Sequence, residues 1–166
     1  MKTRSVTRIA RSIALIGLLW FTTTSLSAQN PFERLSESQH ITSVIVHKGI
    51  LQMASNIPGM ELAGGLQLKD IISKLDAVEI YTSNNKRGAN LVDTEANKYF
   101  KNNKSLETLM QVKQADQTVR FYGEKGRRNN FSSMIMYVSQ SDQVTLIRMR
   151  GDFTIQDIQK ITKQSK

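Results

Sequence analysis

The sequence contains no cysteine, and this absence removes several kinds of chemistry at once. Without thiols the chain has no disulfide, no thiolate ligand for a metal and no cysteine nucleophile. It also offers no cysteine to which a lipid could be attached. We therefore expect a fold whose stability comes from its hydrophobic core, without covalent cross-links.

Other motifs of catalysis and cofactor binding are missing as well. The two histidines, His40 and His47, flank one predicted strand at an odd separation, which places them on opposite faces and disfavours a shared metal ion. The glycines form no dinucleotide- or phosphate-binding pattern, and no Gly-x-Ser-x-Gly segment is present. The carboxylates are scattered, with no pair placed for acid–base work. The sequence therefore predicts no catalytic residue, no cofactor and no metal.

Long hydrophobic runs are also scarce. The apolar run over residues 13–21 is about half the roughly 20 residues that a membrane-spanning helix needs. Small residues follow it as far as Ala28, and a basic segment precedes it, with Lys2, Arg4, Arg8 and Arg11. This order is typical of a secretory signal peptide over residues 1–28. We expect cleavage after Ser27 or Ala28, and hence a periplasmic or secreted protein that is not lipid-anchored.

The charge of the chain changes when this signal is removed. The signal holds four of the 23 Lys and Arg residues and none of the 14 Asp and Glu residues, so the net charge falls from +9 to +5. The polar residues 29–39 are expected to form a flexible leader. Residues 40–166 are enough for one domain with its own core.

Alternating and β-branched segments predict five strands, over residues 41–46, 77–82, 118–122, 131–138 and 144–150. Helical spacing predicts helices over residues 68–75 and 89–104, and a capping box at Thr154 and Asp157 predicts a last helix. Residues 105–112 fit either a short helix or the beginning of a strand. The predicted order is β-α-β-α-β-β-β-α. This order indicates a two-layer α+β domain with helices on one face of a mostly antiparallel sheet, in which the β-α-β opening allows one parallel pair.

Four stretches carry a family resemblance: residues 41–53, 66–75 with 78–82, 109–113 and 146–158. The last, a strand followed by Gly-Asp-Phe-Thr and a helix, is the most specific. In order and spacing they resemble the exported Bacteroidetes proteins grouped as domain-of-unknown-function family 4252. The resemblance covers nearly all of the chain after the signal and implies export and this fold, but no catalytic residue. Some members carry a lipid-accepting cysteine, from which this chain departs.

Basic side chains are the one feature above background in the last third of the chain. Arg148 and Arg150 share a strand face because side chains alternate, and Arg120 lies in a neighbouring strand. Since the apolar Ile147 and Met149 take the opposite face, we expect helices to cover that side and the arginines to face water. Arg120, Arg148 and Arg150 would then form an anion-binding face, or they would simply keep the sheet soluble.

Three functions remain open at this point. The first is a non-catalytic binding or interaction module of the bacterial cell envelope, with an envelope protein, a lipid or a polyanion as partner and no nucleic acid. The second is a small-ligand or lipid carrier whose methionines line a cavity. The third is an extracytoplasmic hydrolase, which would need a pocket of polar groups with perturbed pKa values. Lys125, Arg127 and Arg128 lie in a predicted hairpin loop and add to the basic surface, and the sequence assigns them no binding or catalytic role.

Overall fold

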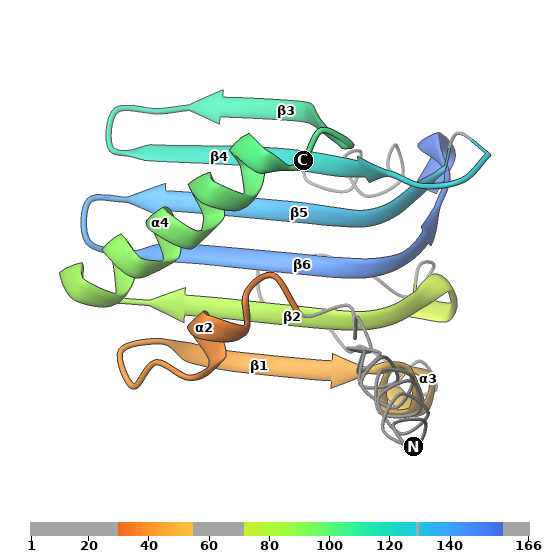
Figure 1. Cartoon of the computed structure of the whole chain (residues 1–166), viewed down its shortest axis with the longest axis horizontal. Coiled ribbons are helices and arrows are strands. Elements are labelled where there is room, and N and C mark those ends of the chain that lie inside the picture. Colours follow the sequence, from red (N-terminus) through yellow and green to blue (C-terminus); the bar gives the residue numbers. More distant parts are fainter. Residues whose placement is uncertain (1–29, 55–71, 129, 158–166) are drawn as a thin grey trace, which may run out of the picture. The chain divides into compact units, whose positions relative to one another are not determined.

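The computed structural model describes residues 30–54, 72–128 and 130–157 (Figure 1). The chain divides into two units, residues 1–30 and 31–166, and every element described below belongs to the second. In the described ranges, six strands form one sheet in the spatial order β1-β2-β6-β5-β4-β3. No helix in these ranges is long and apolar enough to cross a membrane. The strands are β1 (Thr42–His47), β2 (Leu75–Ser83), β3 (Leu106–Lys113), β4 (Gln117–Lys125), β5 (Phe131–Gln140) and β6 (Val144–Phe153).

Every pair of neighbouring strands in this sheet is antiparallel, which fits the predicted α+β class. The parallel pair that the predicted opening allows does not occur, because β1 and β2 also run antiparallel. The ambiguous segment over residues 105–112 contributes the strand β3. Four strands therefore follow one another from β3 to β6, and the element order differs from the predicted β-α-β-α-β-β-β-α.

The predicted helix over residues 68–75 is wrong in the part that can be compared. Residues 68–71 lie outside the described residues, Ile72–Lys74 form one 3₁₀ turn (η1), and Leu75 begins β2. Ile72 and Leu75 are both buried in one cluster, so the spacing that suggests a helix here serves a turn and a strand. Gly151 of β6 permits this approach, because a Cβ there would lie 2.2 Å from the carbonyl oxygen of Lys74.

Helix α4 (Lys86–Asn102) corresponds to the predicted helix over residues 89–104. Asn85 caps its first turn, since the side-chain oxygen accepts a hydrogen bond of 2.9 Å from the backbone N–H of Gly88. A Cβ at Gly88 would lie 2.2 Å from the hydroxyl oxygen of Ser83, at the end of β2. Glycine thus lets the helix begin directly against the sheet.

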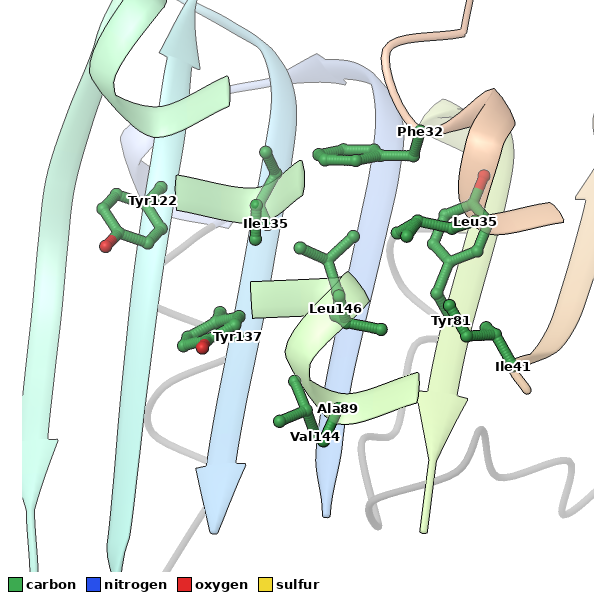
Figure 2. Packing of buried hydrophobic residues seen from close by; sticks show 12 residues of the cluster. Phe32, Leu35, Ile41, Tyr81, Ala89, Tyr122, Ile135, Tyr137, Val144 and Leu146 are labelled. Atoms are coloured by element: carbon green, nitrogen blue, oxygen red, sulfur yellow. The ribbon is translucent and has the colours of Figure 1, made fainter. Parts of the chain in front are cut away.

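Helices α4 and α2 (Glu33–Ser36) lie over one face of the sheet, which we call the helix-covered face (Figure 1). Figure 2 shows the core between these helices and the sheet, which includes Tyr81, Ile135 and Leu146 from three strands. Phe32 and Leu35 are completely buried in it. Phe32 and Leu35 therefore do not behave as part of the flexible leader expected over residues 29–39, because their side chains fill the space beside α4.

The opposite side of the sheet, which we call the second face, has its own core cluster. Helix α3 (Lys48–Ala54) contributes Leu51, and β6 contributes Ile147 and Met149. In register, each of the six strands places one apolar side chain in a single row across this face: Val44, Ile80, Ile147, Met136, Phe121 and Met110. The second face is therefore apolar from one edge of the sheet to the other.

The predicted capping box after β6 is present. The carboxylate of Asp157 accepts a hydrogen bond of 2.8 Å from the backbone N–H of Thr154, and the backbone N–H of Asp157 donates to the Thr154 hydroxyl at 3.3 Å. Residues 155–157 are helical, and the rest of the predicted helix lies outside the described residues.

Candidate functional site

The three arginines of the predicted anion-binding face do share one side of the sheet. Arg148 and Arg150 alternate with Ile147 and Met149 along β6, and Arg120 of β4 has the same facing as Arg148 in the strand register. This side is the helix-covered face, because Ile147 and Met149 belong to the cluster of the second face. The prediction that Arg148 faces water is therefore wrong, because α2 and α4 cover this side and its side chain is 12% exposed, whereas Arg150 is 42% exposed. Ile147 and Met149 are buried on the second face, as predicted, where α3 contributes Leu51 to the same cluster.

Arg148 can occupy this position because carboxylates from two other strands compensate its charge. Glu79 of β2 lies directly opposite Arg148 in register and is 2% exposed. Its carboxylate oxygens lie 2.9 Å from Nε of Arg150 and 3.7 Å from Nη1 of Arg148, and Glu124 of β4 lies 3.8 Å from Nη2 of Arg148. Two arginines thus face two glutamates, and the network carries no net charge.

Aromatic side chains complete the surroundings of Arg148. Its guanidinium carbon lies 6.0 Å from the ring centre of Phe32 and 5.9 Å from that of Tyr99, within range of cation–π attraction. The Tyr99 hydroxyl and the Asn103 amide donate hydrogen bonds of 3.0 and 2.9 Å to Glu124. Burial raises the pKa of Tyr99, Arg148 opposes this shift, and Glu124 adds to it. The network therefore ties α4 to the sheet.

Arg120 lies outside that network. It stands opposite Tyr137 of β5, whose hydroxyl donates a hydrogen bond to Asp93 of α4. Burial and this hydrogen bond raise the pKa of Tyr137 well above its usual value, whereas the charge of Arg120 acts in the opposite direction. In the described part of the chain, Arg120 has no ion pair, and its buried Nε has no hydrogen-bond partner.

A different group of cations lies at the turn between β4 and β5. Arg127 and Arg128 are exposed and line a cavity of about 470 Å³, which we call the hairpin cavity. The Asn130 amide donates a hydrogen bond of 2.8 Å to the carboxylate of Asp152 in the same cavity. Neither guanidinium group has an ion pair or a hydrogen bond within residues 30–54, 72–128 and 130–157. The sequence signal was two adjacent arginines in a predicted turn, which alone could not distinguish a site from a solvated loop.

An adjoining cavity of about 470 Å³ shares Asn130 and Asp152, but its cations are compensated. Lys48 lies 3.0 Å from Asp76, and Lys74 lies 2.6 Å from Asp157. Burial raises the pKa of Asp157, but the hydrogen bonds from Lys74 and Thr154 outweigh it and lower the pKa to about 2. The uncompensated charge at this end of the sheet therefore lies in the hairpin cavity.

The histidines occupy separate positions. His47 ends β1 opposite Ala77 and is exposed, whereas the backbone carbonyl of His40 accepts a hydrogen bond of 3.0 Å from Ser83. Among the residues whose placement is described, no group of three or more His, Cys, Asp or Glu could hold a metal ion.

Comparison with known proteins gives one match. A family model with the description "Domain of unknown function (DUF4252)" matches residues 32–161, which confirms the resemblance inferred from the sequence. The matched range includes Phe32 and both cavities' lining residues. No curated protein and no solved structure matches the chain.

Proposed function

We propose that this chain, which belongs to the DUF4252 family of domains of unknown function, is a non-catalytic binding module of the bacterial cell envelope with an anionic partner. The observation that carries the proposal is the distribution of compensated and free cations. Arg148 and Arg150 face carboxylates beneath the helices, whereas Arg127 and Arg128 project at a cavity without a partner in the described ranges. Free arginines at a cavity rim are suited to attract and hold an anion.

The envelope location rests on residues 1–28, which lie outside the described residues. Their basic, apolar and small segments support export. N-terminal sequencing of protein made in an exporting host should find Ala28 or Gln29 as the first residue. Exported protein that still begins at Met1 or Lys2 would contradict this part of the proposal.

Binding through exposed arginines depends on salt, because charges attract over about 10 Å at 0.1 M ionic strength and over shorter distances as salt rises. We expect the protein to co-sediment with phosphatidylglycerol vesicles at low salt, less at high salt, and not with phosphatidylcholine vesicles. Changing Arg127→Gln and Arg128→Gln together should reduce this binding at least about tenfold. Wild-type protein without salt-sensitive binding to the vesicles would contradict a membrane surface as the anionic partner.

Two further variants locate the binding charge. Lys113 is an exposed cation beside the turn between β3 and β4, at the other end of β4 from Arg127 and Arg128. Lys113→Gln should therefore leave binding within about twofold of wild type. Arg120→Gln tests the site predicted from the sequence, since Arg120 has no ion pair among the described residues. A larger loss with Arg120→Gln than with the hairpin variants would return the site to the helix-covered face.

A second candidate function is a lipid or small-ligand carrier, and the apolar row across the second face favours it. Val44 and Met110, at the two ends of the row, are 45% and 37% exposed. Methionine side chains adapt to varied apolar ligands. Titration with a fluorescent fatty acid should then give saturable binding that Met110→Glu weakens, whereas the hairpin variants leave it unchanged. Absence of saturation would exclude the carrier function.

A further inference from the structure

The turn that carries the free arginines has an uncommon backbone. Arg128 has a φ of 55°, in the left-handed region that side chains with a Cβ rarely adopt. Two backbone hydrogen bonds hold the turn in this form: Asn130 N–H to the Arg127 carbonyl at 3.1 Å, and Gly126 N–H to the Asn130 carbonyl at 2.8 Å. Glycine would adopt the same φ without strain. An arginine at this position therefore carries a backbone strain that glycine would avoid.

The hairpin cavity collects groups that suit an oxyanion. Two consecutive residues, Arg127 and Arg128, carry planar forks of N–H donors. Ser132 lies in the same lining, and its hydroxyl donates to the Glu124 carbonyl at 3.4 Å. Asp152 is the one carboxylate among these lining residues, and it accepts a hydrogen bond from Asn130. The lining side chains therefore carry two positive charges and one negative charge.

We propose that the hairpin cavity binds a phosphoryl group, either as free phosphate or as the terminal phosphate of a lipid headgroup. A guanidinium group donates two parallel hydrogen bonds to phosphate oxygens, and a tetrahedral phosphoryl group has enough oxygens for two such groups at once. A carboxylate has only two oxygens and can pair in this two-bond manner with one guanidinium group only. This assignment rests on the proposed function, because it names the ligand class for the same two arginines, which have no partner among the described residues.

Calorimetric titration of the purified protein with inorganic phosphate tests the assignment, with sodium chloride at matched ionic strength as the control titrant. Wild-type protein should bind one phosphate saturably. Arg127→Gln and Arg128→Gln should each weaken binding at least about tenfold, whereas Lys113→Gln should stay within about twofold. Asp152→Asn should tighten phosphate binding, because it removes a repelling charge and keeps an oxygen that accepts from Asn130.

Arg128→Gly separates a binding role from a structural one. Glycine relieves the left-handed strain, so the melting temperature should rise by about 2–4 °C while phosphate binding is lost. A variant that melts lower than wild type, or that still binds phosphate normally, would overturn the argument from strain.

Vesicles distinguish the two sources of the phosphoryl group. Saturable phosphate binding together with selective binding of phosphatidic acid vesicles over phosphatidylserine vesicles assigns a lipid headgroup, whereas phosphate binding without vesicle binding assigns free phosphate and contradicts a membrane partner. Equal binding to all anionic vesicles without saturable phosphate binding overturns the cavity assignment but leaves the proposed function standing. Absence of both kinds of binding overturns both.

Discussion

The two faces of the sheet contrast in a way that burial alone does not explain. The helix-covered face includes Glu79 and Arg148 as direct cross-strand neighbours, although α4 and α2 pack over it. The second face presents an apolar row from all six strands, and its outer members Val44 and Met110 are more than a third exposed. The contrast teaches that helices can cover a charged face when other strands supply the opposite charges.

Electrostatics explains why Arg148 can be buried only beside carboxylates. Moving an unpaired charge out of water costs several kcal/mol, and a well-placed opposite charge offsets much of this cost. Arg148 has such partners in Glu79 of β2 and Glu124 of β4. Ile147 and Met149 need no partner, so they can pack equally well on either side of the sheet. The strand β6 therefore buries apolar side chains on both faces, with Leu146 beside Arg148 under the helices and Ile147 on the second face.

The largest expected effect comes from removing the charge of Glu79, the buried carboxylate within reach of both Arg148 and Arg150. Glu79→Gln preserves shape but removes the buried negative charge, and it should lower the free energy of unfolding by about 3–5 kcal/mol in urea denaturation. Glu107→Gln is the matched control, because Glu107 of β3 pairs with Lys125 of β4 at 3.2 Å and both side chains are half exposed. The control should cost about 0–1 kcal/mol. Equal effects of the two changes would remove the distinction between paired interior and surface charges.

The second face should depend on apolar volume instead. Ile147→Ala shortens a side chain that is 6% exposed, and it should lower the free energy of unfolding by about 2–5 kcal/mol. Met110→Ala, in the same row at the edge of the sheet, should cost less than about 1 kcal/mol, because Met110 is 37% exposed and loses less burial than Ile147. Equal losses in the free energy of unfolding for Ile147→Ala and Met110→Ala would contradict tight packing at the centre of the row.

One buried carboxylate borders the second face, and acid should reveal it. The pKa of Asp157 lies at about 2 in the folded protein and near 3.8 in the unfolded chain, so it contributes stability that is present above pH 4 and is lost as pH falls through 2. The contribution is at most about 2 kcal/mol. Urea denaturation from pH 5 to pH 2 should show this loss in wild type and a smaller loss in Asp157→Asn. Parallel curves for the two proteins would contradict the pairing of Asp157 with Lys74.

The smallest expected effect concerns the cap beside that carboxylate. Thr154→Ala removes the hydroxyl that accepts from the Asp157 backbone, and it should cost about 0.5–2 kcal/mol. Thr154→Ser keeps the acceptor and should restore most of the lost stability. An unchanged denaturation midpoint at unchanged slope in the alanine variant would show that the cap contributes nothing.

Several of these features could be predicted from the sequence, and the failures have a common cause. The β-branched and alternating segments of five strands, the helix near residues 89–104 and the Thr154 cap are local patterns, and the structure contains them. The facing of Arg148, the strand start at Leu75 and the buried Phe32 depend on residues far away in the chain. Alternation predicts that Arg148 and Ile147 lie on opposite faces, but only the distant Glu79 determines which face a helix can cover.

The same limit applies to the candidate site. The sequence predicts that Arg120, Arg148 and Arg150 share a face, and in the strand register their positions have the same facing. It does not reveal that Glu79 and Glu124 compensate two of them. It also gives no sign that the φ of Arg128 is positive or that a cavity lies beside it, because both depend on the turn closed by Asn130.

A double-mutant cycle on Glu79 and Arg148 tests the central claim most directly, namely that their pairing makes the charged face an interior face. The free energies of unfolding of Glu79→Leu, Arg148→Met and the double variant are compared with wild type. We expect each single change to cost about 3–5 kcal/mol, and the double change to recover part of this loss with a coupling energy of about 1–3 kcal/mol. Losses that add to within about 0.5 kcal/mol would contradict the claim, because independent residues do not compensate one another.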